Sequence, residues 1–210
     1  MSFAKFGSIT RCTTTMTCWG NIHKWIVRYG DESNPNFHEL ERILSTENIT
    51  KITPNGNNAL HFAAIAQSSQ ILAYLLETAP LTLIDEPNDL GETPLHWACD
   101  SGSISHVELL VRTGANCHAL DNESNTILHF AAQAGNVPVT KFILKKNLCP
   151  TECANIANKT PLAVACEERE IRIVRALVRS GASTYPLIRH YASAHEPKIV
   201  KELSRETKLK

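Results

Sequence analysis

Three histidines recur in nearly identical contexts: His61 within NALHFAA, His96 within TPLHWAC and His129 within TILHFAA. An imidazole can act as a general base, as a metal ligand or as a hydrogen-bonding group in a packed core. Each of these histidines follows a leucine and precedes an aromatic residue, which indicates a buried site where a polar group needs a partner. A structural role is therefore favoured, because three ligands in separate segments could not converge on one metal ion.

The cysteines are the second set of residues that could do chemistry. Cys117 and His118 lie near one predicted turn, and Cys149 and Cys153 lie near the next, so a four-ligand zinc site across adjacent turns is an alternative. The spacing is not that of paired C-x₂-C zinc ligands. Ordinary free thiols in turns are favoured, and no cofactor is expected.

Catalytic motifs are absent from the sequence: no Walker A, dinucleotide-binding, H-E-x-x-H, G-x-S-x-G or EF-hand pattern is present. Cys99 and Cys166 each replace an alanine of the repeated segment, where free cysteine behaves as a small hydrophobe. A Cys–His nucleophilic dyad with His190 or His195 lacks a recognisable oxyanion or orienting partner. The chain is therefore not expected to be an enzyme.

These residues are positioned by an internal repeat. With TPLAVAC as a fourth copy, the leucines at 60, 95, 128 and 162 are 35, 33 and 34 residues apart, a period that signals a solenoid. Each copy is followed by a second apolar stripe with helical spacing, so each unit is predicted to be a helix pair. Glycines at 102 and 135, and at 114 and 181, lie where the first and second helices should end.

The motif TPLHWAC, the period and the glycine positions resemble the ankyrin repeat over about residues 53 to 185. The resemblance implies an all-α ankyrin-repeat solenoid of helix-turn-helix units with short finger turns. It also implies that the recurring histidines hydrogen-bond across turns and to the next repeat. We expect an N-terminal tail (1–18), a degenerate capping helix pair (19–52), four central repeats (53–187) and a C-terminal capping segment (188–210). Ser124 in place of glycine, and NLCPTECAN in place of a Gly-Ala turn, put the local loop geometry in question.

Composition limits the class of protein. The 210 residues carry 21 basic and 21 acidic side chains, so no global field favours nucleic acid or an anionic membrane. No apolar run reaches the roughly 20 residues of a membrane span, and no secretory signal is recognised. Seven cysteines without disulfide-framework spacing favour reduced thiols in a cytoplasmic compartment. The chain is expected to be monomeric by itself.

By the resemblance, the function is non-catalytic binding of another protein through the concave surface, as an adaptor, scaffold or inhibitor. A bacterial effector delivered into a host cell is one variant, and an enzyme or metal-dependent regulator that uses Cys and His residues of the turns is the alternative. Acids at the family's contact positions suggest a basic partner segment, with solubilising surface charge as the alternative, and Leu90, Leu120 and Ile156 are the candidate apolar anchors. The expected partner-binding residues are Asp89, Leu90, Glu92, Asp100, Ser101, Leu120, Asn122, Glu123, Asn125, Gln133, Ile156 and Lys159.

A row of arginines, Arg172, Arg175 and Arg179, lies beside the apolar stripe of the last repeat. Because no aromatic residues that could stack on bases are interleaved, a solvated outer face is favoured over nucleic-acid or phosphate binding. Nucleic acid is therefore not an expected partner.

Overall fold

The structure is a computed structural model that describes residues 26, 38, 41–42, 53–185, 187–188 and 197–205. Its regular elements are helical, and no strand occurs in this described part of the chain, which confirms the all-α prediction. The helices are α3 (Ala59–Ile65), α4 (Ser69–Thr78), α5 (Pro94–Ser101), α6 (Ile104–Arg112), α7 (Ile127–Gln133), α8 (Val137–Lys146), α9 (Pro161–Glu167), α10 (Ile171–Arg179) and α12 (Pro197–Arg205), with a short 3₁₀ helix η4 (Leu81–Ile84).

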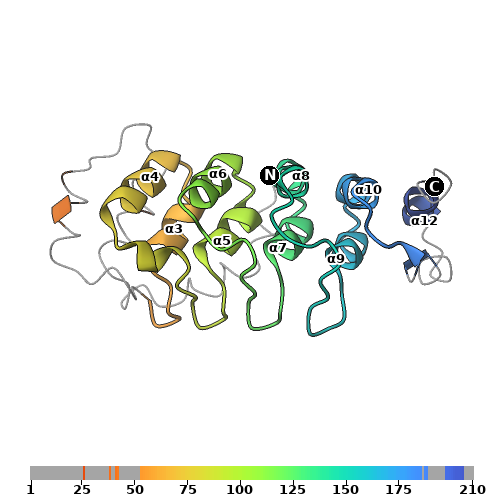
Figure 1. The fold of residues 1–210 in the computed structure, drawn as a ribbon, viewed down its shortest axis with the longest axis horizontal. Helices are drawn as coiled ribbons and strands as arrows, with labels where there is room; N and C mark the ends of the chain where they lie inside the picture. The colour runs from red at the N-terminus through yellow and green to blue at the C-terminus, as the bar shows by residue number, and fades with distance from the viewer. Residues whose placement is uncertain are drawn as a thin grey trace.

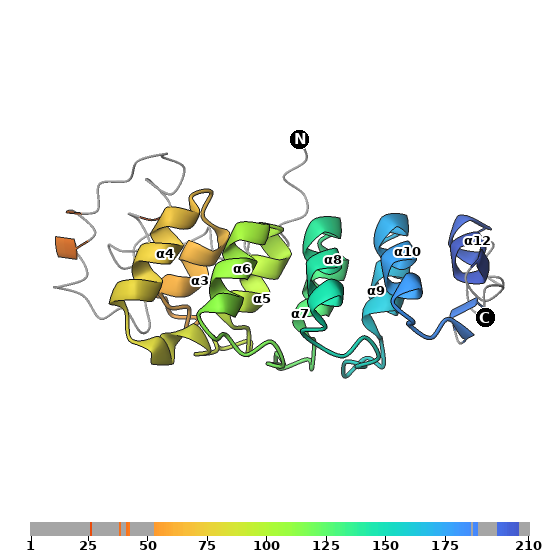
Figure 2. The same cartoon turned by 45° about the horizontal axis from the view of Figure 1, so that its top comes forward.

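The helices form two parallel layers in an elongated row (Figure 1). Helices α3, α5, α7 and α9 pack side by side in the inner layer, and α4, α6, α8, α10 and α12 follow one another in the outer layer. Turning the molecule shows the same order (Figure 2). Four hairpin-like turns, the fingers, precede the four inner helices and project from one edge of the row.

Local sequence explains where the inner helices begin and end. Thr93, Thr126 and Thr160 are the N-cap residues of α5, α7 and α9. Pro94 occupies the first turn of α5, where its missing N–H is no loss. Gly102 ends the same helix at φ 81°, a left-handed conformation that glycine adopts without a Cβ penalty.

The core runs along the row between the layers. The four recurring leucines are at most 1% exposed. The alanines three residues later are fully buried and leave room for the neighbouring helices to approach closely; they are Ala63, Ala98, Ala131 and Ala165. The outer layer supplies the facing apolar stripe, which is formed by Ile71, Val107, Val139 and Ile173. Cys99 and Cys166 are also fully buried, as their positions predicted.

The departures from the repeat pattern do not disturb the fold. Ser124 adopts φ 62° and Asn158 φ 58°, so they take the left-handed position that Gly91 occupies at 78°. Asn147 (φ 51°) ends α8 and Arg169 (φ 59°) follows α9, where other repeats carry glycine. Asparagine adopts this conformation more readily than most residues, whereas Ser124 and Arg169 accept one that is sparsely populated for their residue types.

The predicted end segments lie largely outside the described residues. Residues 1–18 are not described at all, and within 19–52 only four residues are, of which Ile26 is buried in the core at 2% exposure. At the other end, α12 packs against α10 and buries Ile199 and Leu203. The boundaries at 18, 52 and 187 stay predictions.

Candidate functional site

The fingers are joined to one another by backbone hydrogen bonds. The Asp89 N–H donates to the Asn55 carbonyl (3.0 Å), and the Asn122 N–H donates to the Leu90 carbonyl (2.9 Å). The Ile156 N–H then donates to the Glu123 carbonyl (2.9 Å). Each of the three bonds links one finger to the next, so the four fingertips form one continuous, cross-braced row.

Each of the three later fingers is also closed by a side chain at its base. Asn88 Oδ1 accepts the N–H groups of Leu90 and Glu92, both at 2.9 Å. Asp121 Oδ1 accepts those of Glu123 and Asn125, and Asn155 Oδ1 accepts that of Lys159. Short polar side chains that bond their own turn hold its shape, so the residues at the fingertips are presented on a preformed scaffold.

Two of the expected acidic contacts, Asp89 and Glu123, are exposed on neighbouring fingers. Asp100 is half-buried near the end of α5, and burial, assisted by the charge of Glu92, raises the pKa of its carboxyl to about 6. Desolvation disfavours the ionised form of an acid. Asp89 and Glu123 are thus accessible carboxylates, whereas the charge of Asp100 changes near pH 6.

Glu92 is not the exposed contact that was expected, because it is only 6% exposed. Its Oε2 accepts hydrogen bonds from Trp97 Nε1 (2.7 Å) and from Asn88 Nδ2 (2.9 Å). The same Asn88 amide donates to Asn57 Oδ1 in the preceding finger (2.9 Å). Glu92 therefore links a finger to an inner helix, and its side chain is a structural group with little surface for a partner.

Other expected contact residues have bonding partners within the chain. Asn125 Nδ2 donates to Asp121 Oδ2, and Asn125 Oδ1 accepts from the Asn155 amide at 2.8 Å. Lys159 Nζ forms an ion pair with Glu167 Oε2 at 2.7 Å. These contacts link or brace the fingers and reduce the polar groups that a partner meets.

Three further expected contact residues have side chains that are exposed or half-buried. Asn122 is exposed and its amide donates to the Asp89 carbonyl. Ser101 is half-buried and its hydroxyl donates to the Ala98 carbonyl at 3.0 Å. Gln133 is exposed at the last residue of α7.

The expected apolar anchors are all exposed. Leu90 is 58% exposed, Leu120 51% and Ile156 72%. Leu90 and Ile156 flank the finger that carries Asn122 and Glu123. The Leu90 carbonyl accepts the Asn122 N–H, and the Ile156 N–H donates to the Glu123 carbonyl. We define the finger face as Asp89, Leu90, Asp100, Glu123 and Ile156.

All three recurring histidines form a hydrogen bond within their repeat, and two of them, His61 and His129, also form the expected bond to the next repeat. Nδ1 of His61, His96 and His129 accepts the N–H of the N-cap residue three positions earlier, at 3.1, 3.0 and 3.1 Å. His61 Nε2 reaches the Glu92 carbonyl, and His129 Nε2 reaches the Lys159 carbonyl, both at 2.9 Å in the next finger. Since Nδ1 accepts, Nε2 carries the proton and donates.

His96 departs from this pattern. Its Nε2 forms no hydrogen bond with any described residue, although the charge of Asp121 and the carbonyl groups of Ala119 and Asn125 favour protonation of the ring. Burial outweighs them and lowers the pKa of His96 to about 4, as it does for His61. These imidazoles are neutral structural groups at pH 7.

The cysteines of the described residues are all free. Burial raises the pKa of Cys149 to about 11 and also raises the pKa of Cys117, so neither thiol is activated as a nucleophile. Within the part of the chain that the structure describes, no group of three or more His, Cys, Asp or Glu side chains could hold a metal ion. Nor does any helix there have the length and apolar character of a membrane span.

The similarity of this chain to known proteins lies in its repeats. The chain matches the family described as ankyrin repeats in three copies, over residues 25–121 and 107–187. It is 37% identical over 95 residues to the nuclear factor NF-kappa-B p105 subunit of Gallus gallus, a match that covers 43% of this chain and 10% of that protein. It is 32% identical over 162 residues to alpha-latrotoxin-Lg1a of Latrodectus geometricus, covering 73% and 12%.

A viral protein is also similar. Interferon antagonist OPG040 of Vaccinia virus (strain Western Reserve) is 26% identical over 149 residues, which are 71% of this chain and 51% of that protein. The chain thus spans between a tenth and about half of the length of these relatives. Ankyrin repeats are protein–protein interaction modules, and the family is typically non-catalytic. With stacked helix pairs, bonded fingers and matches from residue 25 to residue 187, the chain belongs to the ankyrin-repeat family.

Proposed function

We propose that this chain is a non-catalytic adaptor, scaffold or inhibitor, monomeric by itself, that binds a basic protein segment with the finger face. The observation that carries the proposal is the bonded row of fingertips, which presents exposed Asp89 and Glu123 beside exposed Leu90 and Ile156. A scaffold that is already braced loses little conformational entropy on binding. The finger face therefore combines charge, apolar area and rigidity.

The two kinds of side chain have separable effects. Carboxylates at the rim attract a basic segment and speed its association, an effect that salt screens. Leu90 and Ile156 lose their contact with water only in the complex, so they slow its dissociation. Because the pKa of Asp100 is about 6, protonation below that pH removes a negative charge and slows association.

We place this function in a reducing, cytoplasmic compartment. All five cysteines of the described residues are free thiols, and buried thiols such as Cys99 persist in that state where disulfides are reduced. An effector that acts inside a host cell would work in the same conditions. The same finger face would serve it, because its binding physics does not depend on origin.

The first experiment locates the contact. A photo-cross-linking amino acid replaces Leu90 or Ile156, and in a control it replaces Leu81, whose exposure of 64% lies between theirs but which is in η4, outside the fingers. We expect cross-links to the affinity-purified partner from the two finger positions only. Efficient cross-linking from Leu81 with none from the fingers would contradict the proposal.

The second experiment tests the chemistry with that purified partner. Asp89→Asn/Glu123→Gln should lower the association rate constant and its dependence on salt, whereas Leu90→Ala should mainly raise the dissociation rate constant. The control Glu77→Gln/Glu108→Gln makes the same change of charge on exposed outer-layer residues. Equal rates for all variants, or an equal loss in the control, would reject the finger face as the acidic binding site.

A further inference from the structure

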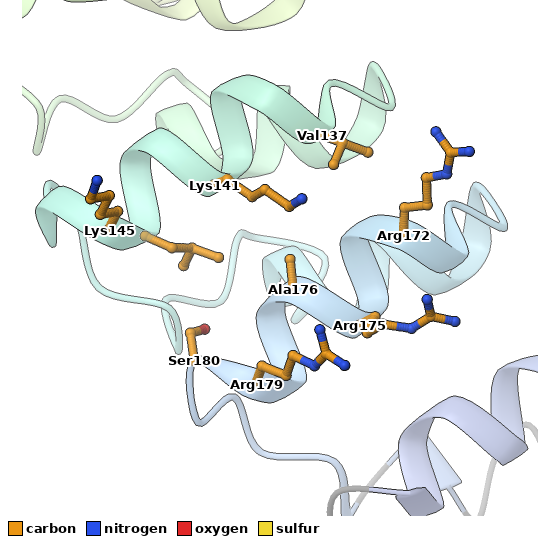
Figure 3. A pocket seen from close by; sticks show the side chains of 9 residues that line it. Val137, Lys141, Lys145, Arg172, Arg175, Ala176, Arg179 and Ser180 are labelled. Atoms are coloured by element: carbon orange, nitrogen blue, oxygen red, sulfur yellow. The ribbon is translucent and has the colours of Figure 1, made fainter.

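A cleft of about 630 Å³ lies between the neighbouring outer helices α8 and α10, away from the finger face. Figure 3 shows two lysines of α8 and three arginines of α10 around it. Its apolar lining comes from Val137, Leu144 and Ala176, and Ser180 adds a hydroxyl. The five cations of this outer cleft are Lys141, Lys145, Arg172, Arg175 and Arg179.

The charge of the outer cleft follows from the repeat. Lys141 and Arg175 are 34 residues apart, as are Lys145 and Arg179, which matches the offset between the third and fourth recurring leucines. Equivalent positions of stacked repeats lie side by side, so two short runs that are unremarkable along the chain merge into one basic surface. None of the described residues that line it is acidic.

Three of its five cations are both exposed and unpaired among the described residues. Lys141, Lys145 and Arg172 are exposed, and no carboxylate among the described residues pairs with any of the three. Arg172 and Arg179 are seven positions apart on one helix, which is about 10 Å along its axis. That length equals about three residues of extended peptide.

We propose that the outer cleft binds an acidic segment of a protein, with carboxylates on its cations and an apolar side chain against its apolar lining. Guanidinium groups donate two parallel hydrogen bonds to a carboxylate. The apolar lining residues Val137, Leu144 and Ala176 offer an apolar side chain a contact that a free polyphosphate would leave unused. No aromatic side chain lines the cleft, so nucleic-acid bases find no stacking surface there.

This inference adds a second surface to the proposed function and does not depend on it. The finger face is acidic and formed by inner-layer elements and fingers, whereas the outer cleft is basic and formed by two outer helices. One chain could therefore hold a basic and an acidic segment at separate places, which is the property that a linking adaptor requires.

The test uses the full chain and a fluorescein-labelled peptide with the sequence EELEELEE, followed by fluorescence anisotropy at low and moderate salt. The matched peptide QQLQQLQQ has the same apolar side chains without charge. The test variant is Lys145→Gln/Arg172→Gln, and the control is Arg112→Gln/Lys146→Gln, which removes two cations from exposed outer-helix positions outside the cleft. Circular dichroism of both variants checks that the exposed substitutions leave the fold intact.

We expect the acidic peptide to bind and the glutamine peptide to bind far more weakly. The test variant should weaken binding about tenfold, since two charge-assisted hydrogen-bonding groups are lost, while the control stays within about twofold of the wild type. Absence of binding, or an equal loss in the control variant, would overturn the inference.

Three other probes decide the identity of the occupant. Inositol hexakisphosphate, single-stranded DNA and phosphatidylserine vesicles are tested with the same two variants. Tighter binding of any of these than of the acidic peptide, lost in the test variant alone, would overturn the inference in favour of that ligand. Sedimentation that shows a dimer lost in the test variant would assign the cleft to a second copy of the chain and would overturn it as well.

Discussion

His129 and His96 can be compared directly, because the hydrogen bonding of their rings differs at Nε2. Each accepts the N–H of its N-cap threonine at Nδ1 and lies 2.9–3.0 Å from that threonine's hydroxyl oxygen. Only His129 continues the connection, with Nε2 donating to the Lys159 carbonyl at 2.9 Å. We therefore predict that His129→Asn destabilises the protein more than His96→Asn does.

The size of the difference follows from what remains bonded. The Lys159 carbonyl also accepts the Asn155 N–H at 3.0 Å, so it keeps one partner after the histidine is removed. The loss is then one net hydrogen bond of about 1 kcal/mol, not the larger cost of an orphaned buried carbonyl. Asparagine retains a polar group near the position of Nδ1, so the N-cap bond can persist in both variants.

The assay is urea and thermal unfolding followed by far-UV circular dichroism at neutral pH. For a chain of this length, 1 kcal/mol corresponds to a difference in Tm of about 2–4 °C between the two variants. His96 packs against Phe130 with ring centroids 4.9 Å apart, so His96→Asn has a packing cost of its own. Equal destabilisation, or a larger loss in His96→Asn, would refute the conclusion that the bond between repeats sets the difference.

Acid should destabilise the protein through its buried neutral histidines. Burial lowers the pKa of His61 and His96 from 6.5 to about 4. As the pH falls, these side chains therefore take up protons in the unfolded chain at a higher pH than in the folded protein. Stability should fall as pH decreases from about 6.5 towards 4, by roughly 3 kcal/mol per histidine, and pH-dependent urea unfolding of His61→Asn/His96→Asn should give a flatter profile. Gly91→Ala should destabilise more than Gly114→Ala in the same assay, because an added Cβ meets the Asn122 backbone nitrogen at 2.6 Å in the first case and nothing within 4 Å in the second. Both positions have positive φ, so equal losses would mean that backbone strain alone matters.

The period of the sequence is sufficient to predict the helix pairs and their core. A leucine and an alanine at fixed positions in each copy must face the same interior, and the structure buries all of them. The turns were harder to predict, because Ser124, Asn147 and Arg169 occupy the left-handed conformation without being glycine. Local propensity favours this conformation for asparagine, whereas it does not predict it for Ser124 and Arg169.

Side-chain exposure at the candidate site was predicted less well, because it depends on contacts between repeats. Glu92 occupies a family contact position, yet Trp97 and Asn88 draw its carboxylate inward. Lys159 has the equivalent place in the last finger and forms an ion pair with Glu167. A position in a motif fixes where the backbone lies, whereas the neighbouring side chains decide what a partner can reach.

The basic outer cleft shows why total charge is a poor guide to this chain's partners. The sequence has no net charge, but periodic stacking places Lys141 beside Arg175 and collects cations on outer helices. The finger face carries Asp89 and Glu123 in the fingers that precede the inner helices. Free energies of well-separated sites add, so Lys145→Gln/Arg172→Gln should leave the affinity for a basic segment unchanged at moderate salt, where long-range fields are screened. If Lys145→Gln/Arg172→Gln and Asp89→Asn/Glu123→Gln each weakened the binding of the same partner, that partner would contact both faces.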